Sequence, residues 1–259
     1  MDGLDRIRAS LVAALACAIA WAGAATDLRA GPIAQPAGLA ATLVSTEPFG
    51  LGTSGLTAGM LNDKWQQLAR RLDDDRVQIA LCDGDREHCV SSAALRFIAV
   101  VDHGRAREGR AKLGEINRAV NLAIRPVSDL AQYGEEDVWS SPLVTFDRGA
   151  GDCEDYAIAK YLALREAGIS ARDLRIVILH DVLHHEDHAV AAARLDGHWL
   201  VLDNQRMAMI KDTDAKFVRP LYVIDDTGVA KYAEAPRLAS APEPPPSAAA
   251  APAVIAAAD

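Results

Sequence analysis

Aromatic residues are scarce in this sequence, and basic residues are fewer than acidic ones. Phe, Trp and Tyr make up 5% of its 259 residues, so the core has to be built mainly from Ala, Val, Leu and Ile. The formal net charge is −9, and no stripe of Lys and Arg offsets it. Because nucleic-acid phosphates repel an acidic surface, this composition argues against nucleic acid as a partner. Half of the residues are apolar, which is typical of a globular protein, and the length suits one domain with tails.

Long apolar runs are also scarce, and the one present lies near the N-terminus. Arg6 and Arg8 precede an apolar run over 11–22, which a Gly-Ala-Ala sequence follows. A basic start, a short apolar stretch and a small-residue end are features of a secretory signal peptide. The run is shorter than the about 20 residues of a spanning helix, although an uncleaved anchor is the alternative. The sequence therefore predicts export, with residues 1–25 as the signal peptide.

Cysteine is rare, with four residues in the chain. Cys17 falls in the signal segment. Cys82 and Cys89 lie in a Gly- and Asp-rich stretch where a turn can bring them together, so a disulfide is expected in an oxidising compartment. Cys153 is left without a partner. In an exported protein, such a residue is either a buried apolar side chain or a reactive thiol.

Changes in composition and hydrophobic period divide the chain into tails and one domain. Residues 26–59 show no clear periodicity and are expected to order only in part, and the Pro/Ala-rich residues 233–259 are expected to be disordered. The domain, at 60–232, begins with segments of helical period and continues with short apolar segments between turns. Helices are predicted at 61–72, 91–101, 115–124 and 153–167, and strands at 174–179, 188–195, 198–203 and 221–225. Helices followed by an antiparallel sheet predict an α+β fold.

Cys153 lies where a Gly-rich loop enters a predicted helix. A helix N-terminus presents unpaired N–H groups and partial positive charge, which favour a thiolate and can receive an oxyanion. The glycines of the loop allow a substrate backbone to come close. The alternative is structural, with Asp152 as an N-cap and Cys153 as a small first-turn residue. This segment by itself does not decide between the two.

A cysteine nucleophile needs a base and a group that orients the base. Asp196-Gly197 predicts a hairpin between two of the strands. That hairpin places His188 and Asp203 at its open end, within reach of a His–Asp hydrogen bond. The sequence thus offers Cys153, His188 and Asp203 as catalytic residues. A zinc site in the histidine-rich loop 180–188 is a competing interpretation.

Three carboxylates flank the thiol in the sequence, those of Asp152, Glu154 and Asp155. Like-charge repulsion from them would raise the pKa of the thiol and oppose the effect of the helix end. Ca²⁺, which binds several carboxylate and carbonyl oxygens, would neutralise these acids and fix the loop. The sequence therefore suggests a calcium site formed by the three acids. The alternative is that one or two of them face water at the favourable end of the helix.

Together these segments resemble the bacterial transglutaminase-like cysteine proteinases, the LapG-type periplasmic proteases. The resemblance covers about residues 60–232, and the GDCEDYA and LVLDN sequences are its most specific parts. It is carried by DVW at 137–139 with Pro142, GDCEDYAIAKYLALREAGI, LRIVIL, HAV at 188–190, LVLDN at 200–204 and RPLYVID at 219–225.

The resemblance implies a papain/transglutaminase-like fold, with the nucleophile at the N-terminus of a helix packed on an antiparallel sheet. It implies a triad of Cys153, His188 and Asp203. It also implies Ca²⁺ bound by Asp152 and Glu154, with Asp155 in addition. The expected activity is a periplasmic endopeptidase that cuts a large surface adhesin in its N-terminal part at an Ala-Ala site and so controls biofilm release. An inner-membrane cyclic-di-GMP receptor is the expected sequestering partner, and Trp139 is a candidate for substrate or partner contact, with a core position as its alternative.

Two other functions stay open on the sequence. The same triad serves acyl transfer to amines, so a transglutaminase or deamidase acting on Gln side chains is the first. The second is a non-catalytic module that holds a peptide in the groove of the same fold. The complete set of Cys, His and Asp counts against that module, because peptide binding does not require all three.

Overall fold

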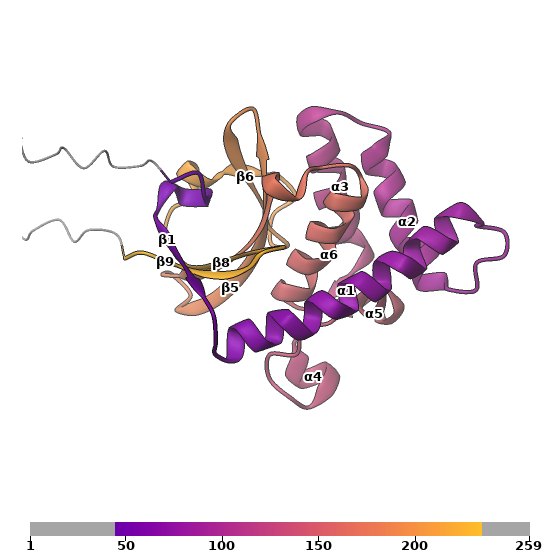
Figure 1. Cartoon of the computed structure of the whole chain (residues 1–259), viewed down its shortest axis with the longest axis horizontal. Helices are drawn as coiled ribbons and strands as arrows, with labels where there is room; N and C mark the ends of the chain where they lie inside the picture. Colours follow the sequence, from indigo (N-terminus) through magenta and orange to yellow (C-terminus); the bar gives the residue numbers. More distant parts are fainter. Residues whose placement is uncertain (1–44, 235–259) are drawn as a thin grey trace, which may run out of the picture. The chain divides into compact units, whose positions relative to one another are not determined.

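Residues 45–234 form a layer of helices against one face of a seven-stranded antiparallel sheet (Figure 1). This range is what the computed structural model describes. The predicted signal peptide at 1–25, with Cys17, and all but the first two residues of the predicted tail at 233–259 lie outside it. The architecture is α+β, which confirms the predicted fold class.

The structure contains a helix or strand at each predicted segment, most of them longer than predicted, and adds several that the sequence pattern did not predict. The helices are α1 (Met60–Gly84), α2 (Ser92–Arg105), α3 (Gly109–Ala123), α4 (Asp129–Tyr133), α5 (Pro142–Arg148) and α6 (Cys153–Glu166). The strands of the large sheet are β1 (Thr53–Leu56), β4 (Leu174–Asp181), β5 (Glu186–Leu195), β6 (His198–Leu202), β7 (Ile210–Lys211), β8 (Val218–Asp225) and β9 (Gly228–Tyr232). Their order in the sheet is β1-β9-β8-β4-β5-β6-β7, and a separate parallel pair joins β2 (Arg125–Pro126) to β3 (Ala150–Gly151).

The additional elements are short or lie where periodicity is weak. Strand β1 belongs to residues 26–59, the segment expected to order only in part, and it pairs with β9 at one edge of the sheet. Helices α4 and α5 have five and seven residues, too few to establish a 3.6-residue period.

Helix α6 lies between the sheet and the other helices (Figure 1). It packs on β4 and β5 on one side and on α2, α3 and α5 on the other. Residues 155–164 are consequently all buried, and most of them are apolar. Asp155 and Lys160 are the two charged residues inside this stretch, and burial of a charged side chain costs free energy unless the group is paired.

The predicted hairpin joins β5 to β6. Asp196 and Gly197 form its turn with φ of 50° and 78°, as the mirror-image two-residue turns of hairpins require. The register pairs Leu195 with His198 at the turn and Ala191 with Leu202 towards the open end. The start of β5 and the end of β6 therefore lie together, at the edge where His188 and Asp203 are found.

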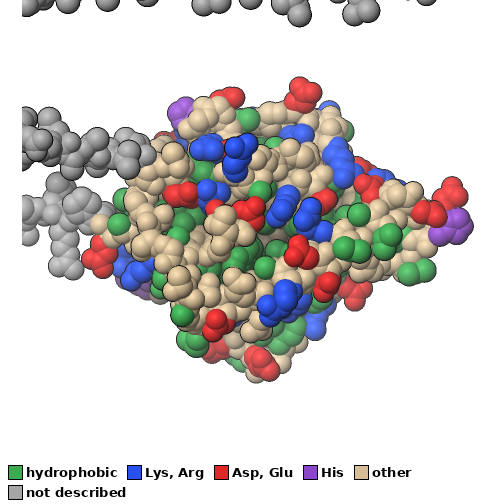
Figure 2. All heavy atoms as spheres, viewed as in Figure 1, with side chains coloured by type: hydrophobic (Ala, Val, Ile, Leu, Met, Phe, Trp, Pro, Cys, Tyr) green, Lys and Arg blue, Asp and Glu red, His purple; other side chains and the backbone are tan. Residues whose placement is uncertain are grey.

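Charges of both signs are interspersed on the face shown in Figure 2. Lys and Arg side chains lie among Asp and Glu side chains there rather than in a separate basic stripe. Within residues 45–234, none of the helices is both long enough and apolar enough to cross a membrane.

The expected disulfide between Cys82 and Cys89 is confirmed, with Cα atoms 4.9 Å apart. It closes the turn between α1 and α2. Cys153 is the free cysteine of the described part of the chain.

Replacing both Cys82 and Cys89 with Ser is expected to lower the free energy of unfolding by about 2 kcal/mol. The bridge closes a short loop and so reduces the entropy of the unfolded chain. Urea unfolding of the double variant and of the wild type, without reductant, measures the difference. An unchanged unfolding midpoint would contradict a stabilising disulfide.

Candidate active site

Cys153 is the first residue of α6, and a tight loop leads into it. Gly149 ends α5 in the left-handed region, with φ of 61°. Gly151 lies against the carboxylate of Asp155: a Cβ added at Gly151 would be 2.7 Å from both Asp155 Cβ and Asp155 Oδ2. The packing of Asp155 therefore requires glycine at position 151. This requirement is separate from the expected approach of a substrate.

The Cys153 thiol donates a hydrogen bond to Glu154 Oε2 at 3.1 Å. Burial raises the pKa of this thiol above its ordinary value, and the neighbouring charge and hydrogen bond of Glu154 raise it further. The backbone N–H of Ala189 has the opposite, weaker effect. The pKa reduction expected from the helix N-terminus is thus outweighed by burial and by the adjacent carboxylate.

His188 and Asp203 form the expected hydrogen bond, with 2.9 Å between His188 Nε2 and Asp203 Oδ1. Both side chains are largely shielded from solvent, at 9% and 15% relative exposure. Asp203 Oδ1 also accepts the Gln205 N–H at 3.0 Å. Although burial by itself would raise the pKa of Asp203, the hydrogen bond and charge of His188 hold it below its ordinary value. Asp203 is therefore an ionised acceptor that fixes the imidazole ring.

The thiol lies next to the His188–Asp203 pair. Ala189, which follows His188 in β5, directs its backbone N–H towards Cys153. Because Nε2 of His188 is engaged by Asp203, Nδ1 is the ring nitrogen left for the thiol. In the described structure the thiol proton is directed to Glu154.

Three carboxylates gather beside the thiol, those of Asp129, Asp152 and Glu154. Their ligand oxygens all lie within 4.8 Å of one another. Asp129 comes from a segment 23 residues earlier in the chain, and the parallel pairing of β2 with β3 brings it here. Its backbone N–H donates to Asp152 Oδ2 at 3.1 Å. Sequence reasoning missed Asp129, because no spacing or motif connects it with Cys153.

Asp155, the third predicted calcium ligand, is not among the three acids whose oxygens lie within 4.8 Å of one another, whereas Asp129, which the sequence did not suggest, is. Successive side chains on a helix are about 100° apart, so Asp155 points into the core while Glu154 does not. Asp155 Oδ1 accepts the Ser140 N–H at 2.9 Å. Asp155 thus connects α6 to the loop before α5.

The acids near the thiol have raised pKa values, and some of their oxygens have no hydrogen-bond partner. Burial, and next the charge of Glu154, raise the pKa of Asp152 to about 7. Burial also raises the pKa of Asp129 to about 6 and that of Asp155 to about 8, with neighbouring carboxylates adding to both shifts. Among residues 45–234, three buried carboxylate oxygens have no hydrogen-bond partner: Asp129 Oδ1 and Asp152 Oδ1 of the group, and Asp155 Oδ2 outside it. Buried polar atoms are nearly always paired, so the unpaired oxygens of Asp129 and Asp152 are acceptors that a cation could occupy.

A hard divalent cation fits this donor set. Ca²⁺ binds oxygens at about 2.3–2.6 Å, which allows ligand oxygens to lie up to about 5 Å apart. The mutual distances among Asp129, Asp152 and Glu154 fall inside that limit. These three side chains are therefore the residues that would hold the ion.

The histidine-rich loop 180–188 is organised by local pairs. His180 Nδ1 lies 2.8 Å from Asp187 Oδ1, and His184 Nδ1 lies 2.8 Å from Asp181 Oδ2. Among residues 45–234, the acids beside the thiol are the one group with metal-binding geometry, and no histidine contributes to it. The geometry thus gives no support to the zinc interpretation.

Trp139, the candidate for substrate or partner contact, is a core residue with 5% relative exposure. Its Nε1 donates to Asp137 Oδ1 at 2.9 Å.

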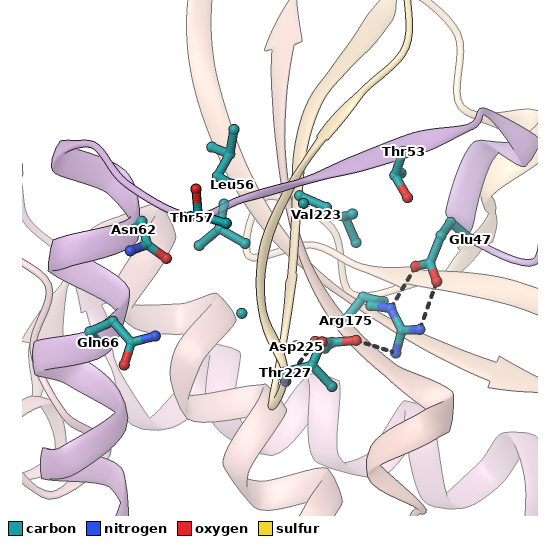
Figure 3. A pocket seen from close by; sticks show the side chains of 14 residues that line it. Glu47, Thr53, Leu56, Thr57, Asn62, Gln66, Arg175, Val223, Asp225 and Thr227 are labelled. Carbon is teal, nitrogen blue, oxygen red and sulfur yellow. Dashed lines mark hydrogen bonds and ion pairs between the residues drawn. The ribbon is translucent and has the colours of Figure 1, made fainter.

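A cavity of about 550 Å³ is lined by none of the candidate catalytic residues (Figure 3). Glu47, Arg175 and Asp225 lie along one wall, and Asn62 and Gln66 of α1 lie along the other. The Arg175 guanidinium is bound by both carboxylates, at 2.6 Å from Glu47 and 3.5 Å from Asp225. The charged side chains of the cavity are therefore paired, and its lining contains no cysteine, serine or histidine.

A cysteine at the N-terminus of a central helix, packed on an antiparallel sheet, defines the transglutaminase-like fold. The family model of the bacterial transglutaminase-like cysteine proteinases (BTLCP) matches residues 77–222, more than half of the chain. The chain therefore belongs to this family of cysteine proteinases.

Solved structures with similarity include LapG of Legionella pneumophila. It is 22% identical, with a TM-score of 0.48 over 71% of this chain and 92% of that one. A calcium-bound form of the same protein gives 22% identity and a TM-score of 0.49 over 68% and 90%. A transglutaminase structure gives 12% identity and a TM-score of 0.34 over 52% and 38%. Comparison with curated proteins finds no match.

Substitution of Gly151 by Ala is expected to lower stability by about 2 kcal/mol, because the new Cβ overlaps the carboxylate of Asp155. Thermal unfolding checks this change. The matched control is Gly84→Ala at the end of α1, where an added Cβ meets nothing within 4 Å. Equal unfolding temperatures for the two variants would show that Asp155 does not require glycine at 151.

Proposed function

We propose that the chain is a calcium-dependent cysteine endopeptidase with Cys153 as nucleophile, His188 as base and Asp203 as the group that orients the base. The single observation that carries this proposal is the His188–Asp203 hydrogen bond beside the helix N-terminal thiol. Membership in a cysteine proteinase family supports it independently.

In the proposed reaction, His188 takes up the Cys153 proton and the thiolate attacks the carbonyl carbon of the scissile peptide bond. The oxyanion that forms is received by the backbone N–H of Cys153, since the first N–H groups of a helix have no partner within it. His188 then delivers its proton to the leaving amine. Water hydrolyses the thioester, and Asp203 keeps His188 in one tautomer throughout.

In this proposal, calcium binds to the carboxylates of Asp129, Asp152 and Glu154. A bound Ca²⁺ would supply positive charge that compensates the three acids and engages Glu154. The Glu154 carboxylate would then no longer hold the Cys153 proton, and that proton would be free to pass to His188. Calcium dependence thus follows from the charge around the thiol.

The natural substrate and the location of the enzyme are proposed from the resemblance in sequence. We infer a periplasmic enzyme, exported through residues 1–25, that cuts a large surface adhesin in its N-terminal region at an Ala-Ala site and so controls biofilm release. An inner-membrane cyclic-di-GMP receptor is the proposed sequestering partner. The acidic net charge of −9 is compatible with a protein substrate.

Cleavage of an adhesin N-terminal fragment with an Ala-Ala site tests the activity. Wild-type protein with calcium is expected to cut the fragment, whereas wild type in EGTA and Cys153→Ala in calcium are both expected to be inactive. Gel electrophoresis and mass spectrometry of the products provide the readout. Release of ammonia without chain cleavage would instead identify a deamidase, and cleavage by Cys153→Ala would exclude the proposed nucleophile.

Asp129→Asn is expected to weaken calcium binding by about tenfold or more, because it removes one charged ligand from the group of three. Isothermal titration calorimetry of the folded protein measures the affinity. Glu136→Gln is the matched control, since this exposed acid lies in the neighbouring loop outside the group. Equal affinities for the two variants would remove Asp129 from the proposed site.

A further inference from the structure

Lys160 is a buried charged side chain that the proposed reaction does not use. It lies on α6, seven residues after Cys153, and its relative exposure is 0%. Burial lowers the pKa of its ammonium group to about 7, and the charge of Asp203 opposes that shift. An apolar side chain of similar length would fill the same space without the cost of burying an amine. The position therefore calls for an explanation beyond packing.

The contacts of Lys160 lead to the end of β6. Its Nζ donates to the backbone carbonyl of Leu202, the residue before Asp203, at 3.4 Å. The Lys160 charge also acts on Asp203, and it helps to keep the pKa of that carboxylate below its ordinary value. One side chain thus connects the helix that carries the thiol with the strand that delivers the orienting acid.

Asp203 is held at further points around its backbone and side chain. Asn121 of α3 donates to the Asp203 carbonyl at 3.0 Å, and the Gln205 N–H donates to Asp203 Oδ1 at 3.0 Å. Of these anchors, Lys160 is the one that comes from α6. The exposed Arg206 side chain also faces the carboxylate, with Nε 3.9 Å from Asp203 Oδ2, whereas the Lys160 charge is fully buried. Its loss would therefore alter both the position and the electrostatic environment of Asp203.

We propose that Lys160 is a positioning residue, which connects α6 to the end of β6 and holds Asp203 in place to orient His188. This inference rests on the proposed triad. Because Lys160 acts through Asp203, removing Lys160 is expected to change the reactivity of Cys153 only when Asp203 is present.

A double-mutant cycle read by the alkylation of Cys153 tests this dependence without any protein substrate. The four proteins are wild type, Lys160→Met, Asp203→Asn and the combination, each saturated with calcium. Iodoacetamide modification of the Cys153 peptide is followed by mass spectrometry at a fixed pH. Lys160→Met is expected to slow the reaction about tenfold when Asp203 is present and to have little effect in Asp203→Asn.

Lys112→Met is the matched control. Lys112 likewise donates to a single backbone carbonyl, that of Ala167 at 3.0 Å, which lies at the other end of α6. This variant is expected to leave Cys153 reactivity unchanged. Should Lys160→Met fail to fold, Lys160→Gln, which keeps an N–H donor without the charge, replaces it and is expected to show the same dependence on Asp203.

The outcomes separate this inference from the proposed function. An equal slowing by Lys160→Met in both backgrounds, or no slowing in either, overturns the positioning role and leaves the triad intact. If wild-type Cys153 reacts no faster than Cys153 in Asp203→Asn, the proposed triad fails, and the inference fails with it.

Discussion

Like-charge repulsion at the N-terminus of α6 is the constraint on which the candidate site depends. Asp129, Asp152 and Glu154 lie within 4.8 Å of one another, and Glu154 holds the proton of the Cys153 thiol. Burial removes the water that would otherwise screen these charges, so it raises the pKa of the Asp129 and Asp152 carboxyls and of the Cys153 thiol. A cation that compensates the acids would free the thiol proton. The proposed calcium dependence would thus follow from where the nucleophile lies.

The central position of α6 in the fold brings these acids and the Cys153 thiol together. The helix is enclosed by the sheet on one side and by α2, α3 and α5 on the other, and its N-terminus lies beside β5. The hairpin of β5 and β6 supplies His188 and Asp203 at its open end, and the short β2–β3 pair supplies Asp129. Elements far apart in the sequence therefore each contribute one part of the site.

Much of this arrangement is predictable from sequence, for identifiable physical reasons. Asp196-Gly197 determines a hairpin, and the hairpin register predicts the His188–Asp203 hydrogen bond that the structure contains. Local patterns also predict the Cys82–Cys89 disulfide and the helix that begins at Cys153. These predictions succeed because each depends on residues close together in the chain or joined by one short turn.

The features that the sequence did not reveal have the opposite origin. Asp129 reaches the site through a two-residue strand pair, too short to leave a periodic signal. Asp155 is adjacent to Glu154 in sequence but points into the core, and only the packing around α6 determines that direction. Lys160 appears in the sequence as an ordinary helix residue, and its burial follows from the enclosure of α6 on both sides. Tertiary packing decides all three positions.

The pH dependence of Cys153 alkylation by iodoacetamide, with calcium and with EGTA, tests the central claim most directly. The acids beside the thiol raise its pKa, and bound calcium is expected to compensate their negative charge. The rate profile in calcium is therefore predicted to lie at lower pH than the profile in EGTA. Superimposable profiles, from protein that binds calcium by calorimetry, would contradict the claim that charge around the thiol makes the site calcium-dependent.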